Sequence, residues 1–180
     1  MKAFITGGGS SGKSYYAQRM AMALEVEPLY YVATMWPMDD EDRARVARHR
    51  TERRDWGFET VEQPSDIEGI LDKCDPGGAF LLDSVTALLS NEMFLADGSV
   101  NEQAAEKIIG GLAQVIPALG HIVIVSDYIY SDAVLYDPLT EAFRRSLAAI
   151  DRAVAAMCDA VIEVAYGNTI WHKGRKAPSA

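Results

Sequence analysis

Short apolar segments alternate with longer amphipathic segments along most of the chain. The apolar, β-prone runs span residues 3–6, 28–34, 79–83, 121–126 and 160–165. Runs without polar alternation indicate strands that are buried on both faces, and their alternation with helical patterns is typical of a parallel sheet. We therefore predict an α/β fold of three layers, in which helices cover both faces of a mainly parallel sheet.

The segments between the apolar runs supply the helices. Asp137 is a good N-cap with Pro138 at the first helical position, and a weaker helix is expected after an N-cap at Ser65. The last two strands are expected to form a hairpin around Gly167 and Asn168. The predicted helices span residues 15–24, 39–50, 65–72, 84–94, 101–119 and 138–157.

A glycine-rich turn follows the first strand and leads directly into the first helix. Its eight positions are Gly7, Gly8, Gly9, Ser10, Ser11, Gly12, Lys13 and Ser14. Glycines let backbone N–H groups turn towards an anion, and the helix N-terminus adds partial positive charge. Lys13 would reach the β- and γ-phosphates, and the Ser14 hydroxyl would bind Mg²⁺. The alternative is an ordinary glycine turn, but the complete motif between a strand and a helix predicts nucleoside triphosphate binding and a P-loop NTPase-like fold.

An acidic residue at the end of another predicted strand supports this prediction. Asp83 ends an apolar strand, as in a Walker B motif, where the carboxylate approaches Mg²⁺. In open parallel sheets the site lies at the carboxyl ends of the strands. Gly7, Thr34, Asp83 and Asp127 all fall at this edge.

Bulk composition narrows the class of protein. With 180 residues and 49% apolar content, we expect one nucleotide-binding domain over residues 1–175 and a frayed tail over 176–180. A net charge of -9 argues against general nucleic-acid binding. No apolar run is long enough to predict a membrane span. Cys74 and Cys158 have no metal or redox spacing, which favours a cytoplasmic location.

Basic residues gather between Arg43 and Arg54, at the end of a helix with an acidic start. This order complements the helix dipole, so a merely solvated face is one interpretation. His49 lies between Arg48 and Arg50, whose charges would disfavour its protonated form and favour a neutral nucleophile. The alternative for His49 is a surface histidine at a helix C-terminus.

Several short motifs at fixed offsets now point to a family. The motifs are the phosphate loop, Tyr31-Val-Ala-Thr34, Asp40-Glu41 with Arg45-Val46 and His49-Arg50, Arg53, Trp56, Glu62-Gln-Pro64, and Leu82-Asp83-Ser-Val-Thr with Asn91. Together they resemble the bifunctional adenosylcobinamide kinase/adenosylcobinamide-phosphate guanylyltransferase family of cobalamin biosynthesis. The resemblance is strongest over residues 1–95.

The resemblance implies two reactions on one corrinoid substrate. Adenosylcobinamide is phosphorylated, and GMP then moves from GTP onto that phosphate through a guanylyl-histidine, which falls on His49. It also implies a homotrimer that uses GTP, ATP and Mg²⁺. The catalytic positions are His49 and Lys13, and the metal positions are Ser14 and Asp83. The nucleotide positions are Gly7 to Ser14, Ala33, Thr34, Met35, Arg50, Thr51, Glu52, Arg53, Glu62 and Asp83.

The chain departs from the family pattern after its fourth core strand. Residues 126–134 read Ser-Asp-Tyr-Ile-Tyr-Ser-Asp-Ala-Val in place of a glycine-containing motif. Tyr128 and Tyr130 could pack against a large flat ligand or fill a subunit contact. Two further functions stay open at this point. One is a P-loop kinase without a covalent intermediate, and the other is a non-catalytic GTP-binding paralogue.

Overall fold

The computed structural model describes residues 1–36 and 56–174. They form a seven-stranded sheet in the order β3-β2-β4-β5-β1-β6-β7. The strands are β1 (Lys2–Gly7), β2 (Leu29–Ala33), β3 (Glu59–Glu62), β4 (Ala79–Asp83), β5 (His121–Asp127), β6 (Ala160–Ala165) and β7 (Asn168–Lys173). The helices are α1 (Lys13–Met22), α3 (Val85–Met93), α4 (Ala104–Ala118) and α5 (Pro138–Met157), with a 3-10 helix η1 (Ile67–Asp72).

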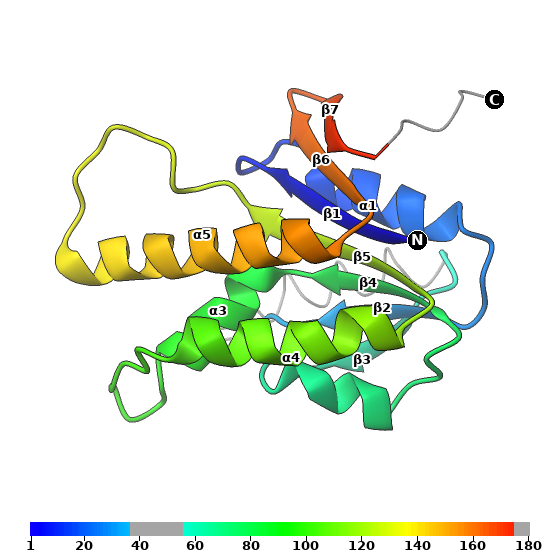
Figure 1. Ribbon diagram of the computed structural model, residues 1–180, viewed down its shortest axis with the longest axis horizontal. Coiled ribbons are helices and arrows are strands. Elements are labelled where there is room, and N and C mark those ends of the chain that lie inside the picture. The colour runs from blue at the N-terminus through cyan, green and yellow to red at the C-terminus, as the bar shows by residue number, and fades with distance from the viewer. Residues whose placement is uncertain (37–55, 175–180) are drawn as a thin grey trace.

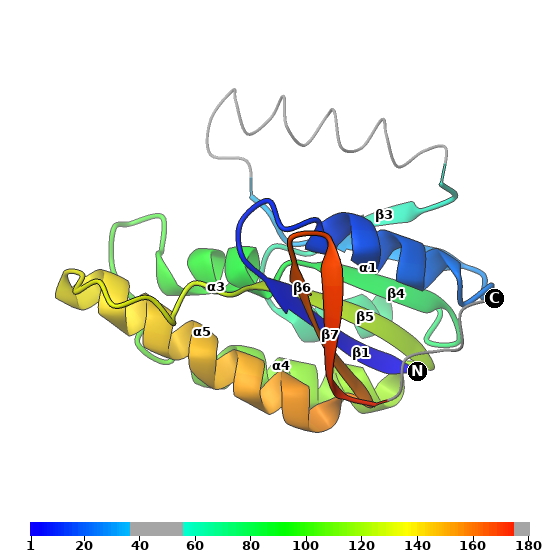
Figure 2. The ribbon, with the colours of Figure 1, turned by 90° about the horizontal axis from the view of Figure 1, so that it is seen from above.

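All neighbouring strands run parallel except the last pair. β6 and β7 form the expected antiparallel hairpin at one edge of the sheet. Helix α1 covers one face, and α3, α4 and α5 lie on the other (Figures 1 and 2). The prediction of a mainly parallel sheet between two helical layers is confirmed.

Each face of the sheet has its own apolar core, because successive strand side chains point to opposite faces. On β1, Phe4 joins the larger core beneath α3, α4 and α5, while Ala3 and Ile5 pack on the side of α1. In β4, Phe80 and Leu82 face the larger core and Leu81 the smaller one. This two-sided burial explains why the central strands carry apolar runs instead of alternating patterns.

The start of α5 agrees with the sequence, whereas the other helix starts differ by a few residues. Asp137 caps α5 by accepting hydrogen bonds from the backbone N–H groups of Leu139 and Thr140. Ser84 is the N-cap of α3, which therefore begins one residue later than expected, and α4 begins at Ala104, also later than expected. The expected Ser65 cap is wrong. The residue before η1 is Asp66, which has a left-handed backbone (φ 48) and no capping hydrogen bond.

The strand register brings the predicted polar positions to one edge of the sheet. Ala33 pairs with Asp83 on one side and with Glu62 on the other. Gly7 pairs with Asp127 across β1 and β5. In the described parts of the chain, no helix is long and apolar enough to cross a membrane.

Candidate active site

The phosphate loop joins β1 to α1 and leaves open space along its glycines. Gly12 is the N-cap of α1 with φ 90, a conformation that favours glycine. At Gly8, Gly9 and Gly12, no described atom lies within 4 Å of the point where a Cβ would stand. The hydroxyl of Ser11 is buried and has no hydrogen-bond partner among the described residues. An open loop at a helix N-terminus is the geometry that binds phosphate.

Lys13 places its amino group over this loop. The residue is only 8% exposed. Its Nζ donates a hydrogen bond of 3.2 Å to the carbonyl oxygen of Gly8 and lies 2.5 Å from Asp127 Oδ1. The loop and its lysine are therefore preformed, with a carboxylate in contact with the ammonium group.

Asp127 is held at the end of β5 from both sides. Its backbone N–H donates to Thr86 Oγ1 at 3.0 Å, and the N–H of Tyr128 donates to the Gly7 carbonyl at 3.0 Å. The sequence placed Asp127 at this edge but assigned it no role. The signal was present, because Asp127 follows an apolar strand just as Asp83 does.

Asp83 ends β4, two strands away from β1. Tyr31 of β2 donates a hydrogen bond of 2.8 Å from its hydroxyl to Asp83 Oδ2, which fixes the carboxylate. Ser14 stands in the first turn of α1. Hydroxyl and carboxylate oxygens are the ligands that Mg²⁺ accepts, and Mg²⁺ in such sites takes its remaining ligands from phosphates and water. No cluster of three His, Cys, Asp or Glu residues that could hold a metal occurs in the described ranges.

Thr34 follows β2 and is fully buried. Its Oγ1 donates to the Ser84 carbonyl at 2.8 Å and accepts from the Ser84 N–H at 2.7 Å. Its own carbonyl accepts a hydrogen bond of 2.7 Å from Asn91 Nδ2. Both hydrogen bonds of the Thr34 hydroxyl are thus made to the backbone of Ser84. The contribution of Thr34 to a nucleotide site would come through the backbone that it holds.

A buried carboxyl group lies behind Asp127. Asp151 on α5 is 3% exposed, and Tyr130 donates to its Oδ2 at 3.0 Å. Burial raises the pKa of Asp151 to about 7, and the negative charge of Asp127 adds to the rise. The nearby Ser126 hydroxyl lowers this pKa somewhat. Even so, Ser126 Oγ and Asp151 Oδ1 have no hydrogen-bond partner of good geometry in the described residues.

Tyr130 is held in place by core packing and by its hydrogen bond to Asp151. It packs against the larger core, and both burial and the charge of Asp151 raise the pKa of its hydroxyl. Tyr128 is 41% exposed and contacts Tyr130 edge to face, with ring centroids 5.0 Å apart. Of the two tyrosines considered for ligand stacking or a subunit contact, Tyr128 is exposed, whereas Tyr130 is partly buried and lines a hollow beside α5.

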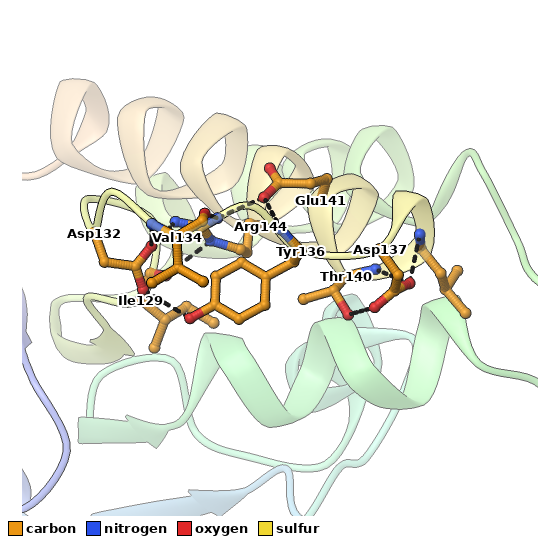
Figure 3. Close-up of polar contacts among 9 residues, drawn as sticks. Ile129, Asp132, Val134, Tyr136, Asp137, Thr140, Glu141 and Arg144 are labelled. Carbon is orange, nitrogen blue, oxygen red and sulfur yellow. Dashed lines mark hydrogen bonds and ion pairs between the residues drawn. The ribbon is translucent and has the colours of Figure 1, made fainter.

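Arg144 of α5 holds the loop between β5 and α5 through hydrogen bonds and ion pairs (Figure 3). Arg144, 7% exposed, donates from Nε to the Ile129 carbonyl at 3.0 Å. It also pairs with Asp132 at 2.7 Å and Glu141 at 2.6 Å, and its guanidinium lies 4.6 Å from the ring centroid of Tyr136. A hollow of about 400 Å³ lies beside this arginine, lined by loop and α5 residues and by none from the phosphate loop. Sequence reasoning assigned Arg144 no role.

The described site residues gather at the carboxyl edge of the sheet. The phosphate loop lies at the end of β1, and Ala33, Glu62 and Asp83 stand level with one another across β2, β3 and β4. Met35 follows directly after Thr34. Five predicted residues lie outside the described residues: His49, Arg50, Thr51, Glu52 and Arg53.

Comparison with known proteins decides the family. The family model "Cobinamide kinase / cobinamide phosphate guanyltransferase" matches residues 3–171. The chain belongs to this family. The resemblance inferred from the short motifs is confirmed, and the match extends well beyond residue 95, where those motifs thin out.

Relatives in the family match nearly the whole chain. The bifunctional adenosylcobalamin biosynthesis protein CobP of Pseudomonas aeruginosa is 28% identical, covering 89% of this chain and 91% of that protein. The bifunctional adenosylcobalamin biosynthesis protein CobU of Escherichia coli is also 28% identical, covering 93% of this chain and 97% of that protein.

Solved structures of distant proteins share the fold. A KaiC-like protein from Pyrococcus horikoshii superposes with a TM-score of 0.56 at 12% identity, covering 99% of this chain and 81% of that one. The flagellar accessory protein FlaH from Methanocaldococcus jannaschii gives a TM-score of 0.53 at 13% identity, covering 99% and 80%. At these identities the likeness shows the α/β P-loop NTPase fold alone, as predicted.

Proposed function

We propose that this chain phosphorylates adenosylcobinamide and then transfers GMP from GTP to the resulting phosphate, which gives adenosylcobinamide-GDP. The observation that carries the proposal is the preformed phosphate loop, with Lys13 over it, in a member of the cobinamide kinase/guanyltransferase family. Both reactions use a nucleoside triphosphate, and one loop can hold the phosphates of ATP or GTP.

In the kinase step the chain binds the phosphates and orients the acceptor. Backbone N–H groups of the loop surround the β-phosphate, and Lys13 turns from Asp127 to the β- and γ-phosphates. Ser14 and Asp83 would hold Mg²⁺. The ion offsets the negative charge of the phosphates when bound.

In the guanylyl step we assign the nucleophile to His49. A ring nitrogen of its neutral imidazole forms a bond to the α-phosphorus of GTP, and the bond to the bridging oxygen breaks, so that pyrophosphate leaves. A phosphate oxygen of adenosylcobinamide phosphate then attacks the same phosphorus. The P–N bond breaks and the imidazole is released. Arg50 and Arg53 would stabilise charge on the phosphates, while Thr51, Glu52 and Glu62 would contact the nucleotide.

We also propose a homotrimer in the cytoplasm. Family resemblance supports the trimer, and both cysteines of the chain are free and buried, as in proteins of reducing compartments. Light scattering after size-exclusion chromatography measures the assembly directly. A molar mass of one chain would contradict the trimer.

Intact-mass spectrometry after incubation with GTP and Mg²⁺ tests the guanylyl step. We expect an acid-labile GMP adduct on the wild-type chain and none on His49→Ala, while GTP binding is retained. His172→Ala is the matched control, because His172 is exposed and pairs with Glu163 on the β6–β7 hairpin. An adduct that persists in His49→Ala would remove His49 from the mechanism. ATP turnover with adenosylcobinamide but no adduct would instead indicate a simple kinase.

A further inference from the structure

The carboxylate of Asp127, which contacts Lys13, is placed where it could take part in phosphoryl transfer as well as in charge pairing. Lys13 is the loop residue that reaches the β- and γ-phosphates, and Asp127 Oδ1 lies 2.5 Å from its amino group. A triphosphate that takes over this ammonium group would bring its terminal phosphate beside Asp127. The carboxylate would then lose its cation and have lone pairs available.

The sheet register separates Asp127 from the metal position. β5 lies between β1 and β4. Asp83 pairs with Val125, whereas Asp127 lies two residues further along the same strand and pairs with Gly7. The two carboxylates therefore occupy successive levels at the edge of the sheet. Asp83 is held by Tyr31, and Asp127 lies closest to the lysine.

Access and rigidity also favour a chemical role. The Asp127 side chain is 29% exposed, so an acceptor can reach it. Its backbone is fixed through Thr86 and through the adjacent N–H bond to Gly7.

We infer that Asp127 is the catalytic base of the kinase step, which accepts the proton of the acceptor hydroxyl. This role rests on the proposed function. The hydroxyl oxygen forms a bond to the γ-phosphorus, and the bond from that phosphorus to the β–γ bridging oxygen breaks. The bridging oxygen keeps the electron pair and leaves with ADP. The hydroxyl proton passes to a carboxylate oxygen of Asp127 and then to water.

The two reactions of this enzyme differ in their need for such a base. Phosphorylation removes a proton from an alcohol. Guanylyl transfer uses an imidazole nitrogen and then a phosphate oxygen, neither of which has to lose an alcohol proton. A base at Asp127 therefore serves one reaction and not the other, whereas a purely structural role would affect both.

Asp127→Asn separates these cases, because it keeps the shape of the side chain and removes its basicity. With ATP and adenosylcobinamide, we expect the kinase kcat to fall by about 10²–10⁴-fold. With GTP and adenosylcobinamide phosphate supplied ready-made, guanylyl transfer should stay within about threefold of wild type. Glu102→Gln removes an exposed carboxylate ahead of α4 and should leave both rates unchanged.

Each other outcome overturns the role. Kinase activity of Asp127→Asn within about threefold of wild type would show that no base is needed there. Equal loss of both reactions, with weaker GTP binding, would assign Asp127 to the placement of Lys13 alone. A wild-type chain that does not phosphorylate adenosylcobinamide would remove the kinase function itself, which is a separate failure.

Discussion

Thr34 and Ser84 are joined by two hydrogen bonds, one in each direction, between the side chain of the first and the backbone of the second. This pair fixes the end of β2 to the residue that follows Asp83. The Thr34 carbonyl extends the connection to Asn91 on α3. The buried Thr34 hydroxyl thus fixes the backbone next to Asp83, the metal position predicted from the sequence.

Thr34→Val tests this connection. Valine fills the same volume but cannot pair with the Ser84 N–H, so we expect a loss of about 1–3 kcal/mol in the free energy of unfolding. Urea denaturation measures the change. Thr34→Ser keeps the hydroxyl and should recover most of the stability. A Thr34→Val chain as stable as wild type would show that the pair contributes nothing.

Gly7→Ala is expected to damage both stability and the phosphate loop. A Cβ at Gly7 would stand 2.4 Å from the Val164 carbonyl oxygen and 2.7 Å from Ser11 Oγ. Because β1 and β6 cannot both keep their places, we expect about 1–3 kcal/mol of destabilisation and at least about tenfold weaker GTP binding. Calorimetry measures both quantities.

Gly8→Ala is the matched control for stability, because its Cβ would meet no described atom within 4 Å. It should unfold within about 0.5 kcal/mol of wild type. Equal free energies of unfolding for Gly7→Ala and Gly8→Ala would show that the close approach of Gly7 to β6 does not affect stability.

Asp151 should make stability depend on pH. Its pKa rises from 3.8 in the unfolded chain to about 7 in the folded protein. Between these values the unfolded chain releases a proton that the folded protein keeps, so this residue lowers stability as pH rises from about 4 to 7. In Asp151→Asn we expect this decrease of the free energy of unfolding with rising pH to disappear. The variant should be more stable than wild type by about 2–4 kcal/mol near pH 8.

Denaturation at several pH values measures this effect. Glu106→Gln, which removes an exposed carboxylate from α4, should keep the wild-type slope. Parallel curves for wild type and Asp151→Asn would contradict a raised pKa at this position. The Tyr130 hydroxyl can still donate to the asparagine oxygen, so its hydrogen bond is preserved in the variant.

Arg144→Met should release the loop between β5 and α5. Methionine keeps much of the packing but loses the bonds to Ile129, Asp132 and Glu141. Both carboxylates are partly exposed, so we expect about 2–4 kcal/mol of destabilisation, less than for a fully buried pair. Amide hydrogen exchange over residues 129–136 should become faster. Arg145→Met is the control, because the neighbouring arginine is exposed. Equal exchange in both variants would contradict the role of Arg144.

The sequence predicted the central strands well, because burial on both faces requires continuous apolar runs. The phosphate loop was equally clear, since its glycines, lysine and serine have fixed positions between a strand and a helix. Asp83 and Asp127 could be placed at the correct edge from the parallel order of the strands alone. The family followed from motifs over the first half of the chain, and the comparisons confirmed it.

What the sequence could not reveal depends on contacts between distant segments. Asp127 touches Lys13 from a strand far along the chain, and no local pattern predicts such a pair. The same holds for Asp151 with Tyr130 and for Arg144 with its loop. The prediction of an N-cap at Ser65 was wrong because Asp66, the residue before η1, adopts a left-handed backbone. The Asp66 N–H donates to Glu92, and its carboxylate pairs with Lys107.

The closed pair of Lys13 and Asp127 has a consequence for selectivity. The Lys13 ammonium group is already paired with the Asp127 carboxylate of its own chain, so a small anion gains little by approaching it. Inorganic phosphate or sulfate would have to displace the carboxylate with few contacts in return. A nucleoside triphosphate brings a chain of phosphates and a base, and can compensate for the exchange. We therefore expect the pair to favour a nucleoside triphosphate over simple anions.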